Sequence, residues 1–328
     1  MSRGTSIFFV IILLIAAAIS LYWLYENLPF GEEQRLIVKN PQNNISEENG
    51  EKAASNDTDE LLSYAANERM QFYPDMRFSK LPVSYSISNE CAEEKAEQMQ
   101  EAIDIMSNET IVSFIPIESN NSDMVIRCRD IDDKEIKMKD YYVAGEGGPR
   151  EIINTSLFNV IVKGEILLLR ESQCPEPIVS VHEILHVLGF GHSINKLSIM
   201  YNISDCRQKL TRDIIDELKR LYSIESLPDL HFQDINATKA GRYLSFSIEI
   251  KNRGLIDSPN TTLAVYVADE KVESFDIDLI EIGGGIVLKV SNLRLPARNT
   301  NEVRFVIDAG NSIKELSEEN NIAVLSVE

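Results

Sequence analysis

Three of the four histidines in this chain of 328 residues lie within one stretch of eleven, HEILHVLGFGH at 182–192. Two interpretations compete: histidines in the core or on the surface of an amphipathic helix, or a zinc site that supports hydrolysis. On an α-helix, His182 and His186 lie one turn apart on the same face, so that both imidazoles can reach one metal ion. The spacing therefore favours the metal site.

The remaining positions of the pattern supply what a hydrolytic zinc site needs. Gly189 can adopt the left-handed conformation that ends a helix, so that His192 can close the site from the next loop. Three imidazoles leave zinc with one open position for a water molecule, whose pKa the ion lowers toward ~7. Glu183 is rotated away from the ligand positions yet close to that water, where a general base is needed. We therefore predict one catalytic Zn²⁺ held by His182, His186 and His192, with Glu183 as the catalytic residue.

The full HExxHxxGxxH string resembles the signature of the metzincin zinc peptidases. Met200 in SIMY, eight residues after His192, resembles their Met-turn, and 210–222 is similar to the last helix of the matrixins. The resemblance implies an endopeptidase whose polypeptide substrate lies antiparallel to an edge strand, which we place near 141–153. Structural Ca²⁺ is frequent in matrixins, but the resemblance assigns no residues to it here. Matrixins often carry a propeptide cysteine that ligates zinc, and no cysteine precedes residue 70.

Hydrophobic periodicity predicts the elements that must position this site within 70–226. We expect a helix that starts after the N-cap Asn89, and a closing helix capped by Thr211. We expect a loop at 143–152 and then a hairpin at 158–171 that turns at Lys163-Gly164. Strands are predicted at 81–88, 111–118 and 123–130. Together these elements give an α+β domain with a mixed sheet, a motif helix and a closing helix.

After Leu227-Pro228-Asp229, helical periodicity gives way to period-two alternation. Seven or so short strands in ~100 residues are typical of an immunoglobulin-like β-sandwich, which we predict over 229–328. The stretch 303–321 is similar to the closing segment of CARDB-type domains, with Asp308, Asn320 and Asn321 at the recurring positions. The resemblance implies an adhesion or spacer module, and therefore a cell-surface partner or a spacer without a ligand.

The N-terminus predicts the compartment. Residues 7–25 carry no charge over nineteen positions, which is enough to cross the ~30 Å hydrocarbon core as a helix. We predict a single-pass signal anchor with a short cytoplasmic segment at 1–6, followed by a polar stalk at 26–69 and an extracellular remainder. A signal peptide cleaved at Ala16-Ala17-Ala18 is the alternative, and it would make the protein secreted.

Cysteines, sequons and charge agree with an extracellular protein. The four cysteines form an even set, and we favour the pairs Cys174–Cys206, which bracket the histidine motif, and Cys91–Cys128. Other pairings, or four thiols, remain open from the sequence. Eight N-x-[ST] sequons from Asn44 to Asn260 predict glycosylation. A net charge of −20 without a basic stripe excludes a nucleic-acid partner.

These features predict a membrane-anchored extracellular zinc endopeptidase that acts on polypeptide substrates. Two alternatives remain open. The first is a surface adhesion protein whose metzincin-like domain is not catalytic, and the second is a metal-dependent hydrolase of a non-peptide amide.

Overall fold

The computed structural model describes residues 35–39, 70–118, 121–129, 141–170 and 174–327. The predicted anchor at 7–25 and most of the predicted stalk lie outside these residues. Within them, no helix combines the length and the apolar character that a membrane crossing requires.

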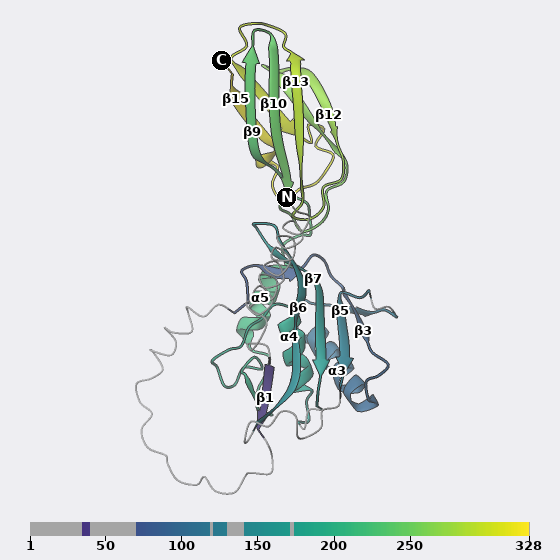
Figure 1. The fold of residues 1–328 in the computed structure, drawn as a ribbon. Coiled ribbons are helices and arrows are strands. Elements are labelled where there is room, and N and C mark those ends of the chain that lie inside the picture. Colours follow the sequence, from purple (N-terminus) through teal and green to yellow (C-terminus); the bar gives the residue numbers. More distant parts are fainter. Residues whose placement is uncertain (1–34, 40–69, 119–120, 130–140, 171–173, 328) are drawn as a thin grey trace, which may run out of the picture.

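The first domain is built on a mixed sheet, whose order in the described residues is β4-β3-β5-β7-β6-β1-β8, with β2 pairing to β7 (Figure 1). The strands are β1 (Arg35–Lys39), β2 (Met76–Phe78), β3 (Val83–Ile87), β4 (Phe114–Pro116), β5 (Met124–Cys128), β6 (Tyr141–Asn154), β7 (Asn159–Leu168) and β8 (Ile203–Ser204). Strands β3, β4, β5 and β7 are parallel, and β6 runs antiparallel to β7. The strand at 35–39 lies within the stretch that the sequence assigned to a polar stalk.

Three described helices belong to this domain: α3 (Glu93–Glu109), α4 (Ile178–Val187) and α5 (Arg212–Tyr222). Helices α3 and α4 contribute Met99, Met106 and Ile184 to one buried core that they share with the sheet. The predicted N-cap Asn89 is wrong, since α3 begins later and its N-cap is Ala92. Thr211 occupies the N-cap position of α5 as predicted, although its side chain makes no capping hydrogen bond.

The predicted loop at 143–152 and the predicted turn at Lys163-Gly164 are both wrong. Strand β6 continues through all of 143–152, and β7 runs straight through Gly164. The chain instead reverses between Asn154 and Asn159, where Ser156 has a φ of 72°. Gly164 is there because α4 packs closely on β7: a Cβ at this position would lie 2.4 Å from Cγ1 of Val187. The glycine therefore marks a close approach of helix and sheet and not a turn.

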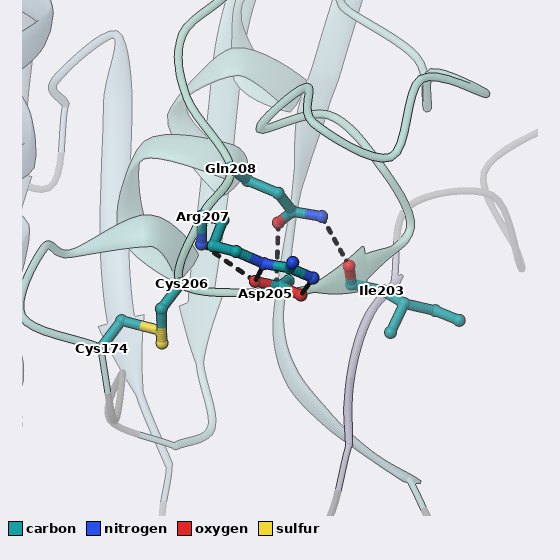
Figure 2. The surroundings of a disulfide bond; sticks show 6 residues. All are labelled: Cys174, Ile203, Asp205, Cys206, Arg207 and Gln208. Carbon is teal, nitrogen blue, oxygen red and sulfur yellow. Dashed lines mark hydrogen bonds and ion pairs between the residues drawn. A yellow bond between two sulfur atoms is a disulfide. The ribbon is translucent and has the colours of Figure 1, made fainter. Parts of the chain in front are cut away.

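Two disulfides join the connecting segments of the first domain. Cys91–Cys128 links the segment before α3 to the end of β5. Cys174–Cys206 links the segment before α4 to the segment after β8 (Figure 2). These are the two pairs that the sequence favoured.

The second domain is a β-sandwich, as the alternation predicted. Its strands are β9 (Leu230–Ala240), β10 (Tyr243–Asn252), β11 (Thr261–Val267), β12 (Glu270–Ile277), β13 (Gly285–Arg294), β14 (Glu302–Ile307) and β15 (Ile322–Ser326), with a 3-10 turn at Glu319–Asn321. One sheet has the order β13-β10-β9 and the other β12-β11-β14-β15. Alternate residues of β10, including Phe246 and Ile248, face Phe305 of β14 in a common core.

The polar residues of the CARDB resemblance make structural contacts inside the sandwich. Asp308 accepts hydrogen bonds from the Ser312 hydroxyl at 2.7 Å and from the backbone N–H of Ile313 at 2.8 Å. Asn320 donates to Asp229 at 2.8 Å, and Asn321 donates to Glu315 at 2.8 Å. Asn320, and Asn321 through Glu315, therefore fasten the closing segment to the start of the domain, whereas Asp308 holds the turn that follows β14.

The turn between β6 and β7 contacts the second domain. The Thr155 hydroxyl donates to the carbonyl of Arg253 at 2.8 Å. Phe158, Val160 and Leu255 form a small buried cluster across the two domains. The sandwich is thus packed against one end of the strand pair that borders helix α4.

Candidate metal centre

Helix α4 carries the first two histidines of the motif, and all ten of its residues are buried. The helix ends at Val187, and Gly189 has a φ of 93°, so the glycine takes the positive φ that the sequence predicted. The chain then turns, and the N–H of Phe190 still donates to the carbonyl of Leu185 at 3.0 Å. His192 follows on the loop. The glycine therefore ends the helix in a way that returns the third histidine to the first two.

The three imidazoles converge on one point. One ring nitrogen from each of His182, His186 and His192 lies within 4.8 Å of the other two. The Nε2 atoms of His186 and His192 are 3.3 Å apart. Nitrogens that each bind one ion at ~2.1 Å must lie about this close to one another. The cluster therefore has the size of a single metal site.

Backbone carbonyls fix which nitrogen of two imidazoles faces the cluster. Nδ1 of His182 lies 2.6 Å from the carbonyl oxygen of Ile199, and Nδ1 of His186 lies 2.7 Å from that of Phe190. A carbonyl can only accept, so each Nδ1 carries the proton and each Nε2 presents a lone pair. Nε2 of His182 is buried and has no hydrogen-bond partner among the described residues. A buried lone pair without a donor is what a metal ion would satisfy, so the residues present fit a metal.

The electrostatic environment keeps the three rings neutral. Burial lowers the pKa of His182 to about 3 and the pKa of His192 to about 4. Burial, followed by the two neighbouring rings, lowers the pKa of His186 well below its ordinary value. Neutral imidazole is the form that binds metal, so the three rings can bind a cation without first losing a proton.

Glu183 lies beside the cluster with no exposed surface. Neither of its carboxylate oxygens has a hydrogen-bond partner among the described residues. Burial raises the pKa of this carboxyl well above its ordinary value, and Glu146 contributes in the same direction. Such a carboxylate takes up a proton more readily than an exposed glutamate, which suits a general base.

The segment around Met200 makes hydrogen bonds that hold two of the histidines in place. Met200 is 1% exposed and belongs to the core of the first domain. Its carbonyl accepts a hydrogen bond from the N–H of Ser193, the residue after His192, at 2.8 Å. The preceding carbonyl, of Ile199, holds Nδ1 of His182. The turn at Met200 therefore orients two of the three predicted ligands.

Sequence reasoning missed several residues that shape this centre. Gly145 and Gly147 of β6 lie against Glu183: a Cβ at 145 would be 2.7 Å from Oε1, and one at 147 would be 2.8 Å from Oε2. Glycines inside a strand often mark the close approach of another element, but a run of glycines with a proline is also typical of the loop predicted here. Phe72 stacks on the ring of His186, with centroids 5.7 Å apart and planes at 19°. No feature of the sequence indicated that contact.

The edge of the sheet beside this centre is occupied. Strand β6 covers the region near 141–153 where the sequence placed a substrate-binding edge. Strand β1 pairs with it antiparallel, from Arg35 opposite Glu146 to Lys39 opposite Tyr141. On its other side β1 pairs parallel with β8. The structure therefore shows β6 as an inner strand with β1 along its outer side.

The fold and the histidine cluster define a metallopeptidase-like domain followed by a β-sandwich. The family comparisons make this specific, since residues 77–223 match the family model of the matrixins and residues 227–324 match that of the CARDB domains. The chain therefore carries a matrixin domain followed by a CARDB domain. No curated protein gave a significant match.

Solved structures similar to the chain cover the second domain. One is the CARDB domain of a Pyrococcus furiosus protein in complex with di-metal ions, with 22% identity over 31% of this chain and 90% of that chain, and a TM-score of 0.26. Another is a domain of a Methanosarcina acetivorans protein named as a cell surface protein, with 18% identity over 31% of this chain and 93% of that chain, and a TM-score of 0.28. The CARDB assignment rests on the family model, because both scores are low.

Proposed function

We propose that this protein is a zinc-dependent endopeptidase that hydrolyses peptide bonds in extended polypeptides. One observation carries the proposal: three neutral imidazoles lie with their ligand atoms within 4.8 Å of one another, beside a buried carboxylate that has no other partner. The matrixin domain supports the same reaction class.

In this proposal His182, His186 and His192 hold one Zn²⁺ through their ring nitrogens. The carbonyls of Ile199 and Phe190 keep two of these rings in the required tautomer. Zinc, when bound, supplies a Lewis acid that polarises the scissile carbonyl and makes a water molecule more acidic. The chain contributes the base, the orientation of the peptide and the exclusion of bulk water.

Glu183 moves the proton. Its carboxylate takes a proton from the attacking water and later gives it to the nitrogen of the leaving amine. Glycines at 145 and 147 leave room for the carboxylate beside β6, as their lack of a side chain allows it to approach the strand. Met200 and Gly189 have positioning roles, because the first supports the loop of His192 and the second turns the chain into it.

We further propose that the protein acts at the cell surface. The uncharged segment at 7–25 supports a membrane anchor with an extracellular remainder. Both disulfides support an oxidising compartment. The CARDB domain supports binding of a surface partner, or a spacer role, next to the peptidase domain.

One observation favours the alternative, a binding protein with a non-catalytic matrixin domain. His182, Glu183 and His186 have no exposed surface and only His192 is partly exposed, so a substrate does not reach the carboxylate in this arrangement. A catalytic role therefore requires that the covering part of the protein moves away or is itself the substrate.

Cleavage of denatured proteins by the purified protein decides between the two functions. The wild type should hydrolyse peptide bonds, and a chelator should abolish this activity, which added zinc should restore. Glu183→Ala should keep the zinc and lose the cleavage, whereas Asp216→Ala, at an exposed position of α5, should change neither. Zinc-loaded wild type that cleaves no peptide in a broad library would establish the binding-only alternative.

A further inference from the structure

Strand β1 lies outside the residues that match the matrixin model, and yet it is part of the matrixin sheet. The family match begins at residue 77, whereas β1 is Arg35–Lys39. It pairs antiparallel with β6, beside which Figure 1 shows it, and parallel with β8 on its other side. This five-residue segment pairs through its backbone with a strand on each side. It therefore resembles a peptide bound in a groove and not an unpaired edge strand.

The register places this segment beside the candidate catalytic carboxylate. Leu36 is opposite Gly145, the residue of β6 whose Cβ, if present, would lie 2.7 Å from Oε1 of Glu183. Ile37 is opposite Val143, so the pairing skips Ala144 between Leu36 and Ile37. Adjacent strands lie about 4.8 Å apart. The peptide bond between Leu36 and Ile37 therefore lies opposite the part of β6 that touches Glu183.

Strand β8, which lies on the other side of β1, is held in place by two contacts. The segment that follows β8 is fastened by the disulfide Cys174–Cys206 (Figure 2). Gln208 also donates to the carbonyl of Ile203, the β8 residue that is in register with Ile37, at 2.7 Å. The space between β6 and β8 can therefore hold an extended strand that runs antiparallel to β6 and parallel to β8.

We propose that Arg35–Lys39 is the enzyme's own substrate, held between β6 and β8 and cut at the Leu36–Ile37 bond. This inference rests on the proposed peptidase function. Two observations carry it: the backbone pairing on both sides, antiparallel to β6 and parallel to β8, and the register that sets Leu36 opposite Gly145. Attachment in one chain gives the segment a high effective concentration at the site, so it excludes external peptides until it is cut.

The proposed step is an ordinary peptide hydrolysis and balances with one water molecule. The bond between the carbonyl carbon of Leu36 and the nitrogen of Ile37 breaks. The water oxygen joins the carbonyl carbon, which becomes the new terminal carboxylate of Leu36. Glu183 carries a proton from that water to the nitrogen, which becomes the new amino terminus at Ile37.

The reaction has two consequences for the protein. It separates residues 1–36, which include the proposed anchor at 7–25, from the two folded domains. It also cuts the strand that is paired between β6 and β8, so that the fragments can leave this position and external substrates can enter it. The sequence of the segment defines the substrate class: a short apolar run, Leu-Ile-Val, between two basic residues.

The test follows the fate of the full chain by intact mass and N-terminal sequencing. Zinc-loaded wild type should convert to a form that begins at Ile37, and Glu183→Ala should stay whole. Ile37→Pro removes the N–H of the residue after the scissile bond and should also stay whole. Glu48→Pro, in the same polar region but outside β1, is the matched control and should be cut like the wild type.

A second measurement reports docking without any activity. In the Glu183→Ala background, hydrogen exchange of the amides at 142–146 should be slow. Adding Ile37→Pro should speed this exchange about tenfold or more, because the outer side of β6 loses its partner, whereas Glu48→Pro should not. The melting temperature of the first domain should remain close to that of the parent in both cases.

The outcomes separate this inference from the proposed function. If external peptides are hydrolysed while residues 35–39 stay whole, the peptidase stands and self-cleavage is wrong. Exchange at 142–146 that is the same with and without Ile37→Pro also overturns the inference, because β1 is then not docked. If no peptide of any kind is cut, the peptidase function itself fails.

Discussion

Gly145 of β6 and Glu183 of α4 are in direct contact, so that a single added Cβ at 145 would lie 2.7 Å from the carboxylate oxygen Oε1. The strand that borders the site and the residue proposed as base are therefore packed without space between them. This contact explains why a glycine occupies the middle of a strand, where it weakens the strand itself.

Gly145→Ala should remove most of the peptidase activity and leave the zinc content unchanged. The added methyl group must push the carboxylate aside, and a displacement of about 1 Å in a catalytic group can cost ~100-fold in rate. Steady-state cleavage and metal analysis on the same sample test this. Gly310→Ala is the control, because a Cβ there meets no atom within 4 Å. Unchanged kcat/KM in Gly145→Ala would contradict the proposed position of the base.

Gly164→Ala should destabilise the first domain by roughly 1–3 kcal/mol, the usual cost of overpacking a dense core. The added Cβ would lie 2.4 Å from Cγ1 of Val187, where α4 rests on β7. Val187→Ala removes that methyl group, so the double variant should recover part of the loss. Urea denaturation of the four proteins in a double-mutant cycle measures the coupling. Additive effects would show that the two residues do not compete for the same space.

Arg77→Met should destabilise the protein by about 3 kcal/mol or more, because it leaves buried carbonyl groups without a donor. The guanidinium is 2% exposed and donates to the carbonyls of Leu221 and Ile224, where α5 ends. Arg207→Met is the matched control: Arg207 pairs with Asp205 on the surface, and its side chain is 81% exposed. Thermal unfolding should show a clear loss for the first variant only. Equal midpoints for the two variants would contradict the structural role of Arg77.

His182 and His192 should reduce the stability of the metal-free protein as pH falls below about 6.5, against an opposite contribution from the raised pKa of Glu183. The folded-state pKa of His182 is about 3 and that of His192 about 4, against an ordinary value of 6.5. Both rings are neutral in the folded state, so their contribution is complete above pH 6.5 and disappears as the unfolded chain takes up protons below it. Unfolding of the chelator-treated protein between pH 7.5 and 4 measures this. His192→Gln should flatten the dependence, whereas His231→Gln should not; parallel curves for wild type and His192→Gln would contradict it.

The sequence predicted the histidine cluster well because its geometry is local. His182, Glu183 and His186 occupy one helical turn. Gly189 follows at the position where the helix must end if His192 is to reach the same ion. The structure places Gly189 at a φ of 93° and brings His192 to the cluster. The strands of the sandwich could be predicted equally well, since the alternation of apolar and polar residues is a local signal in the sequence.

Contacts between distant segments could not be predicted in the same way. Gly145, Gly147 and Gly164 resemble turn residues in the sequence, and only the packing of α4 on the sheet shows that they leave space for Glu183 and Val187. Strand β1 is a short apolar run in a polar segment, too short to predict a strand by itself. Its structure depends on β6 and β8, which lie more than 100 residues further along the chain.

The central claim is that three imidazoles of this chain hold one zinc ion, and X-ray absorption at the zinc edge on the purified protein tests it most directly. We expect one zinc per chain with three imidazole nitrogens at about 2.0–2.1 Å. His192→Ala should lose one of these nitrogens, and His231→Ala should keep all three. Zinc that is absent from the wild type, or that is bound without the three motif histidines, would contradict the account.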